Sequence, residues 1–132
     1  MSRKIKFRIR DFEENKFIDL QDAIITFDSY GLEIYKNNGM ILEEYEINQY
    51  TGLKDANNVD VYEGDLIPYH FNEDVKGVVR YGEYKNPFDD EHANHIGFYV
   101  DFREQKYKNL LRKDLGFWLK ISCVCGNIYE IN

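Results

Sequence analysis

The sequence predicts an all-β protein, with an N-terminal β-meander, a small SH3-like barrel in the C-terminal part and one short helix near residues 103–114. Three observations predict this class. Short apolar runs rich in Val, Ile, Tyr and Phe recur along the chain. Turn-forming Gly, Asn and Asp separate these runs at the spacing of short strands. The first run, residues 3–10, alternates apolar and basic residues with the period of two that is typical of a strand.

The N-terminal part, residues 1–48, contains the predicted meander. Its strand-like segments, separated by polar or glycine-containing turns, cover residues 3–10, 17–18 with 23–27, 32–36 and 40–45. The strongest turn signal is Asn38-Gly39, because Asn-Gly accepts the positive φ angles of a type I′ turn, whose twist matches the flanking strands. We therefore expect residues 32–36 and 40–45 to form a hairpin.

The C-terminal part, residues 49–132, contains the predicted barrel. Its expected strands cover residues 65–71, 75–81 and 97–102, with a closing strand through residues 119–129. The turn between the first two is expected at Asn72-Glu73-Asp74, and Gly77 is expected to mark a bulge or bend. Leucines and Tyr107 recur at helical spacing before Gly116, which predicts the helix near 103–114.

Size and composition limit the class of protein further. The chain has 132 residues, 16% of them aromatic and 31% charged, which favours one ordered domain with a real core. The longest apolar runs are triplets, far short of the ~20 residues of a membrane span. The alternating N-terminal run has no continuous apolar segment of the kind that a signal peptide requires. We therefore expect a cytoplasmic protein without a membrane partner.

The net charge of −7 is unevenly distributed. Residues 1–10 carry five Lys/Arg and no acid, residues 11–102 six against 21 Asp/Glu, and residues 103–132 six against three. An acidic surface disfavours direct nucleic-acid binding, whose affinity comes mainly from phosphate neutralisation, but the basic ends keep that function open. The candidate nucleic-acid-binding residues are Lys4, Lys6, Arg8, Arg10, Arg103, Lys106 and Lys108. We favour the alternative that these side chains form solvated faces of a strand and a helix.

Two clusters raise the question of metal or catalytic chemistry. Cys123 and Cys125 form a C-x-C pair, and His92 and His95 an H-x-x-H pair, which together are the ligand types of a zinc site. The histidines lie within the acidic segment 89–95, and such groups also serve general acid–base catalysis. Because C-x-C is unusual for zinc and all the acidic groups fall in one loop, we favour inert cysteines and a solvated loop. We predict no metal, no cofactor and no catalytic residue.

Turn and strand residues are densest in residues 50–69. Gly52 and Gly64 supply positive φ angles, and Asp55 and Asp65 supply carboxylates that accept hydrogen bonds from nearby backbone amides. The predicted structural residues are Tyr50, Thr51, Gly52, Leu53, Asp55, Tyr62, Glu63, Gly64 and Asp65. We interpret Glu63 and Asp65 as turn residues rather than a catalytic carboxylate pair, with Tyr62 anchoring the core.

This segment closely resembles the signature of the YopX-like family of phage and prophage proteins. The resemblance rests on Tyr50-Thr51-Gly52-Leu53, Asp55, Asn57 and Tyr62-Glu63-Gly64-Asp65. The start, Ile5 to Arg8, and the end, Val124 and Gly126 to Glu130, are similar to the family as well. Asn58 departs from the family's usual glycine, but asparagine also tolerates left-handed geometry.

The resemblance implies a β-rich accessory protein of a phage or prophage, working in the cytoplasm of a bacterial host, with no catalytic residues to carry over. Our leading hypothesis is a non-enzymatic protein that self-associates as a homo-oligomer and binds a phage or host protein, since tyrosine is enriched at interfaces. The alternative is a nucleic-acid-binding small barrel. The third hypothesis is a small metal-dependent enzyme built on segment 89–95 and the two cysteines.

Overall fold

The computed structural model describes residues 4–70, 72–91, 93–103 and 110–130. The chain divides into two compact units, unit 1 with residues 1–5 and 50–132, and unit 2 with residues 6–49. The boundary between residues 49 and 50 lies one residue from the boundary that the sequence analysis places between residues 48 and 49. The two divisions also differ in residues 1–5, which belong to unit 1 and not to the N-terminal part. Antiparallel, curled sheets dominate both units, so the predicted all-β class is confirmed.

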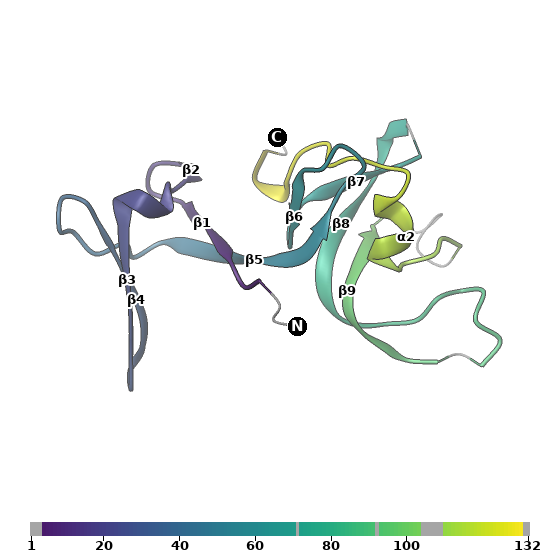
Figure 1. Cartoon of the computed structure of the whole chain (residues 1–132), viewed down its shortest axis with the longest axis horizontal. Coiled ribbons are helices and arrows are strands. Elements are labelled where there is room, and N and C mark those ends of the chain that lie inside the picture. Colours follow the sequence, from purple (N-terminus) through teal and green to yellow (C-terminus); the bar gives the residue numbers. More distant parts are fainter. Residues whose placement is uncertain (1–3, 71, 92, 104–109, 131–132) are drawn as a thin grey trace. The chain divides into compact units, whose positions relative to one another are not determined.

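Unit 2 contains two separate antiparallel arrangements (Figure 1). Its elements are β1 (Phe7–Asp11), β2 (Lys16–Phe17), η1 (Leu20–Asp22), β3 (Ala23–Asp28), β4 (Gly31–Lys36) and the first half of β5 (Tyr45–Lys54). β1 pairs with β2 and also with β5, while β3 and β4 pair only with each other in a two-stranded sheet. The pairing thus departs from a simple meander, because burial of Ile9, Ile34 and Leu42 in one small core draws distant segments together.

The turn at residues 37–39 lies where the sequence predicts it, with a different geometry. Gly39 has a φ of 81°, and Asn38 is not among the residues with positive φ, so the turn is not type I′. The Gly39 amide donates to the Lys36 carbonyl, and the Lys36 amide donates to the Met40 carbonyl, as in a three-residue loop that ends in a left-handed glycine. The expected return strand at 40–45 is reduced to one bridge, Tyr35 to Ile41, before β5 begins.

Unit 1 surrounds a single larger core. Its elements are the second half of β5, β6 (Asp60–Tyr62), β7 (Leu66–Tyr69), β8 (Asn72–Tyr84), β9 (His95–Phe102), α2 (Leu115–Leu119) and η2 (Ile128–Glu130). β5 pairs with β6, and β7, β8 and β9 form a three-stranded antiparallel sheet. The buried core residues come from β6 to β9 and α2: Val61, Ile67, Val75, Val79, Val100, Phe102, Leu115, Trp118 and Leu119.

The helical and closing segments differ from the prediction. Half of the helix expected near 103–114 falls on residues 104–109, which lie outside the described residues, and residues 110–114 are not helical. The helix that is described, α2, follows directly and includes Gly116, because Leu115, Trp118 and Leu119 lie at i, i+3 and i+4 and bury one side of it. The expected closing strand is reduced to one bridge, Asp65 to Asn127, with backbone hydrogen bonds between Leu66 and residues 125–126, and residues 128–130 form η2.

The β7–β8 hairpin forms, but its turn lies earlier than expected. Tyr69 pairs with Asn72, and His70 has a φ of 51°, so residues 72–74 belong to β8. Gly77 marks no bulge of its own; the register shift lies between Pro68 and Tyr69. Glycine is required at Gly77 because a Cβ there would clash with the side chain of Val100.

No helix among the described residues is long and apolar enough to cross a membrane.

Candidate functional site

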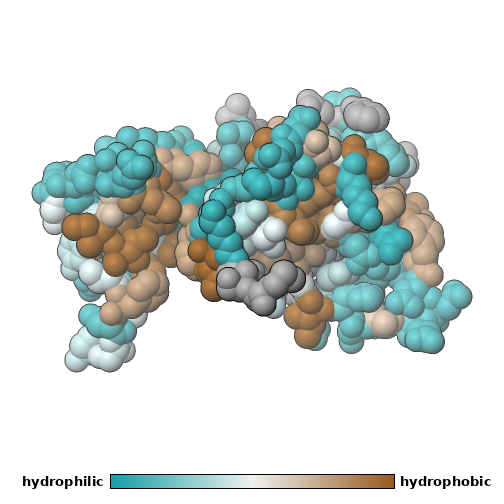
Figure 2. All heavy atoms as spheres, viewed as in Figure 1, coloured by the Kyte–Doolittle hydropathy of each residue, from teal (hydrophilic) through white to brown (hydrophobic). Residues whose placement is uncertain are grey.

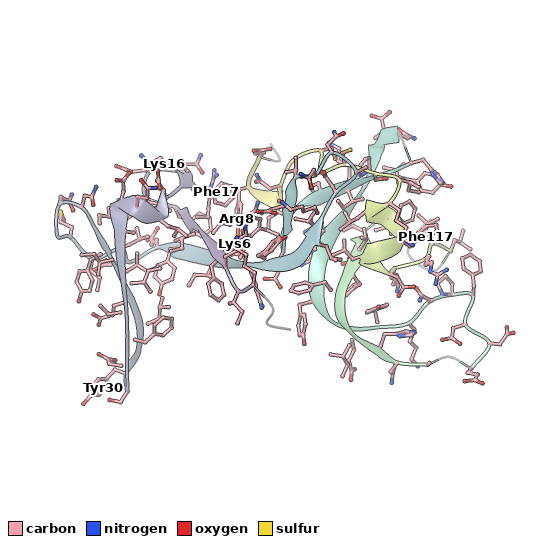
Figure 3. All side chains as sticks on the ribbon, viewed as in Figure 1. Lys6, Arg8, Lys16, Phe17, Tyr30 and Phe117 are labelled. Carbon is pink, nitrogen blue, oxygen red and sulfur yellow. The ribbon has the colours of Figure 1, made fainter. Side chains whose placement is uncertain are left out.

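The β3–β4 hairpin, residues 23–36, projects from unit 2 and is called the arm below (Figure 1). Every residue of β3 after Ala23 is exposed. The exposed fractions are 65% for Ile24, 76% for Phe27 and 97% for Tyr30, which lies at the tip (Figure 3). An isolated two-stranded hairpin is only marginally stable in water, so exposed apolar side chains on it are unusual.

The two faces of the arm follow from strand alternation. Ile25 pairs with Ile34 and Phe27 pairs with Leu32, so these four side chains share one face. Ile34 is fully buried in the core of unit 2, whereas Phe27, further from that core, is mostly exposed. The apolar face therefore continues beyond the core it starts from, and Figure 2 shows hydrophobic residues along the arm.

The two edges of the arm differ in how far they are covered. The outer edge of β4 is covered near its end, where the Lys36 amide donates to the Met40 carbonyl at 2.8 Å and the Leu42 amide donates to the Ile34 carbonyl at 2.7 Å. For β3, the described residues supply no strand partner besides β4. The β3 edge is thus the open edge of the arm.

An ion pair fixes the base of the arm. Lys36 Nζ, at the end of β4, lies 3.0 Å from Asp11 Oδ2 and 3.3 Å from Glu13 Oε2. Burial opposes ionisation of Asp11, but hydrogen bonds from Lys36 and from the amides of Glu14 and Glu13 outweigh it and hold its pKa below the usual value. The hydrogen bond to Asp11 raises the pKa of Lys36. The pair therefore stays charged and holds β4 against β1.

The basic strand β1 uses its arginines inside unit 2. Arg8 and Arg10 both lie over the ring of Phe17, at 4.5 and 5.0 Å from its centroid. Arg8 Nε donates to Asn48 Oδ1, and Arg10 Nη2 donates to the backbone and side-chain oxygens of Asn15. Arg10 is buried, so one side of β1 that the sequence suggests is solvated is packed instead. Stacked guanidinium groups of this kind are stabilised by the aromatic quadrupole.

The remaining candidate nucleic-acid-binding residues lie in both units. Lys6 belongs to unit 2 and is half-buried, while Lys4 and Arg103 belong to unit 1 and are exposed. Lys106 and Lys108 lie outside the described residues. Figure 3 labels Lys6, Arg8, Lys16 and Phe17 on the N-terminal strands of unit 2.

The first half of the signature segment is organised by Thr51 and Asp55, both buried. The Thr51 hydroxyl donates to the Val61 carbonyl at 2.8 Å, which joins β5 to β6. Asp55 Oδ1 accepts hydrogen bonds from the amides of Asn57 and Val59, and Oδ2 accepts one from the amide of Val124. Gly52 has a φ of 85°, and Leu53 is exposed beside it. The carboxylate thus shapes a turn and also fixes the C-terminal segment.

The second half of the signature forms the tight turn before β7. Gly64 has a φ of 91°, and Asp65, which is buried, accepts a hydrogen bond from the Tyr62 amide at 2.8 Å. The half-buried Tyr62 packs against Tyr50 with ring centroids 5.5 Å apart. Glu63 is half-buried. Gly64, through its positive φ, and Asp65, through the hydrogen bond from the Tyr62 amide, thus shape the turn.

A polar pocket of about 280 Å³ lies in unit 1 around Asp114. Asp114 accepts hydrogen bonds from the Tyr84 hydroxyl, the side-chain amide of Asn86 and Arg112 Nε, at 2.7–2.9 Å. Burial, together with the hydrogen bond from its hydroxyl to Asp114, raises the pKa of Tyr84 to about 12. The pocket is lined by Asn86, Phe88, Asp89, His95, Arg112 and Asp114.

This cluster was not predicted from the sequence. Its residues come from β8, the following loop, the first residue of β9 and the segment before α2, and no local pattern joins them. The one available signal was Asp114 directly before a Leu-Gly-Phe-Trp-Leu run, the position of a helix N-cap, although its side chain makes no capping hydrogen bond. Because three donors already satisfy Asp114, its carboxylate is held as an anion rather than poised as a base.

The candidate metal ligands do not form a group in the described residues. Cys123 and Cys125 are both half-exposed, and the Cys125 thiol donates to the Leu66 carbonyl at 3.5 Å. His95 stacks on Tyr84 and lies 3.6 Å from Asp89. His92 lies outside the described residues, and no set of three or more His, Cys, Asp or Glu side chains among the described ones is placed to hold a metal ion.

Two units of curled antiparallel sheet, with the turn signature of residues 50–65 in unit 1, define this chain as a small β-rich protein. A family model described as "YopX protein" matches residues 6–131. The chain belongs to the YopX family.

A solved structure shares this fold. It is the crystal structure of protein EF1440 from Enterococcus faecalis, with 21% sequence identity and a TM-score of 0.50, and the match covers 98% of this chain and 96% of that one. A comparison with curated proteins finds no match.

Proposed function

We propose that this protein is a non-enzymatic accessory protein of a phage or prophage that acts by binding, and that it self-associates through the arm. The observation that carries the proposal is the exposure of Ile24, Phe27 and Tyr30 on a two-stranded hairpin with an open edge. Burying one such side chain stabilises an assembly by roughly 1.5–3 kcal/mol, so contact between two such surfaces is energetically favourable.

The geometry of the polar groups supports a binding role over an enzymatic one. The Asp114 carboxylate accepts hydrogen bonds from three side-chain donors of this chain. The carboxylates of Asp55 and Asp65 accept hydrogen bonds from backbone amides. Catalytic groups need unsatisfied atoms that converge on a substrate. Membership of the YopX family supports the phage or prophage origin. A phage or host protein in the bacterial cytoplasm is the further partner we propose.

The nucleic-acid hypothesis receives less support. Residues 6–49 hold five Lys/Arg against ten Asp/Glu, and the guanidinium groups of Arg8 and Arg10 are engaged with Phe17, Asn48 and Asn15. Phosphate binding needs accessible cations in excess over anions. Salt-dependent retention of single-stranded DNA or RNA by the purified protein would restore this hypothesis.

Light scattering of the purified chain at micromolar concentration tests the proposal. We expect an oligomer for the native protein and a monomer for Phe27→Ser, which removes the exposed ring from the arm. Phe88→Ser is the matched control, because Phe88 is 73% exposed but lies in unit 1 away from the arm sequence. A native protein that is a clean monomer, or an equal effect of both substitutions, would refute self-association through the arm.

A further inference from the structure

We infer that the β3 edges of two copies pair antiparallel about a two-fold axis, which joins two arms into one four-stranded sheet of order β4-β3-β3′-β4′. This inference rests on the proposed function and specifies the contact by which the arm self-associates. The partner is a second copy of this chain, and the contact is made by backbone hydrogen bonds along the open edge of β3.

In the described part of the chain, residues 23–27 of the open edge carry none of the usual protection against strand pairing. Natural sheets shield exposed edges with charged residues, proline, bulges or a covering segment. Residues 23–27, Ala-Ile-Ile-Thr-Phe, contain no charge, no proline and no glycine, and β3 pairs with β4 in unbroken register from Ala23 to Asp28. By contrast, residues 40–42 cover the end of the β4 edge. The edge left open is thus the one whose sequence favours pairing.

The charges around the edge favour a second copy as the occupant. The uncharged residues 23–27 are best matched by another uncharged segment, and the same residues of a second copy supply one. Unit 2, with ten Asp/Glu against five Lys/Arg, is a poor surface for an acidic partner such as nucleic acid. The acidic residues that bound the run, Asp22 and Asp28, lie at its two ends, so antiparallel pairing keeps them from the centre of the seam.

The same two carboxylates select the register. Directly opposed residues of an antiparallel pair point to one face, so a two-fold axis through the sheet must lie at a residue that faces itself. An axis at Ile25 would place Asp22 opposite Asp28′, which like-charge repulsion disfavours. An axis at Thr26 places Asp28 opposite Ile24′ and Asp22 opposite Tyr30′.

The register centred on Thr26 also brings the exposed apolar residues together. Ile25 of one copy then lies opposite Phe27 of the other, on the face that continues the unit 2 core. Thr26 faces its own copy at the axis, a cross-strand pair that is favourable in sheets. Two marginal hairpins become one four-stranded sheet, a size that is stable in proteins.

Cysteine cross-linking tests this register. In a chain with Cys123→Ser and Cys125→Ser, Thr26→Cys places two thiols directly opposite each other, with Cβ atoms about 4.5–5.5 Å apart, close to disulfide geometry. Ile24→Cys is the matched control, because it lies on the same face of β3 and is also exposed. In the Thr26 register its thiol is about 14 Å along the strand from its own copy.

Mild oxidation should convert most of the Thr26→Cys chain into a covalent dimer and leave the Ile24→Cys chain largely monomeric on a non-reducing gel. Equal cross-linking of both variants, or stronger cross-linking of Ile24→Cys, would overturn the inference. If the unmodified protein is an oligomer by light scattering and Thr26→Cys does not cross-link, the β3 pairing is wrong while self-association stands. If the unmodified protein is a monomer, the proposed function itself fails.

Discussion

The Asp55 carboxylate accepts a 2.9 Å hydrogen bond from the backbone N–H of Val124, a residue 69 positions further along the chain. The same carboxylate closes the turn that leads from β5 into β6. One buried side chain therefore couples the signature segment to the C-terminal residues. The segment acts as a clamp on the fold of unit 1 in addition to forming two local turns.

Asp55→Asn tests this clamp. The asparagine oxygen can still accept from Asn57 and Val59, but its NH₂ group would then face the Val124 amide, so two donors oppose each other in a buried site. We expect the free energy of unfolding to fall by about 1–3 kcal/mol in denaturant titrations. Asp90→Asn, in an exposed loop, should change it by less than about 0.5 kcal/mol. Equal stability of the two variants would show that the Val124 contact contributes nothing.

Gly77 provides a second test, of packing between β8 and β9. A Cβ at Gly77 would clash with Val100 Cγ1 and lie 3.2 Å from the Phe102 ring, both of which are buried in the unit 1 core. Gly77→Ala should therefore cost about 1–3 kcal/mol through overpacking, measured as a lower Tm. Gly97→Ala, on the paired strand with no atom within 4 Å of the added carbon, is the control and should keep the native Tm. A Gly77→Ala variant of native Tm would contradict the close packing.

The sequence predicted those features that depend on a few neighbouring residues. The turn at Gly39, the positive φ at Gly64 and the strand pattern of residues 97–102 follow from local backbone preferences and alternation. The YopX signature was recognisable for the same reason, because its turns lie within one continuous segment.

Features that depend on long-range partners could not be predicted. Arg10 looked solvent-exposed because alternation places it opposite Ile9, and its burial depends on Phe17 across the sheet. Likewise, Phe27 ends an apolar strand segment, and its exposure depends on the unit 2 core ending before it. Tertiary contacts overrode local pattern in both cases, and the pairing of β1 with β5 is of the same kind.

The hydrogen bond from the Tyr84 hydroxyl to Asp114 supports a prediction about pH. Tyr84 also stacks with His95 and with Tyr99, with ring centroids 5.1 Å from each. Its pKa lies near 12, because burial and the neighbouring carboxylate both disfavour the phenolate. The pKa of Asp114 lies below its ordinary value: burial opposes this, but hydrogen bonds from Arg112, Tyr84 and Asn86 outweigh the burial.

The two shifts give opposite pH dependences. A lowered carboxyl pKa stabilises the fold above the unfolded-state value of 3.8, and this contribution is lost as pH falls through the lower folded-state pKa. A raised tyrosine pKa stabilises the fold fully below the unfolded-state value of 10.0, and this contribution is lost as pH rises from there toward about 12. The bond is therefore intact across the neutral range and fails at both extremes.

Tyr84→Phe removes the donor and keeps the ring. We expect it to lower the free energy of unfolding at neutral pH by about 1–2 kcal/mol, toward the lower end because Asp114 remains partly exposed. Ultraviolet titration should lose one tyrosine that ionises near pH 12, and Asp114→Asn should move that transition toward pH 10 without deleting it. Tyr81→Phe, on the same strand with its side chain exposed, is the control and should leave stability unchanged. If Tyr84 ionises near pH 10 in the native protein, the hydrogen bond to Asp114 does not form in solution.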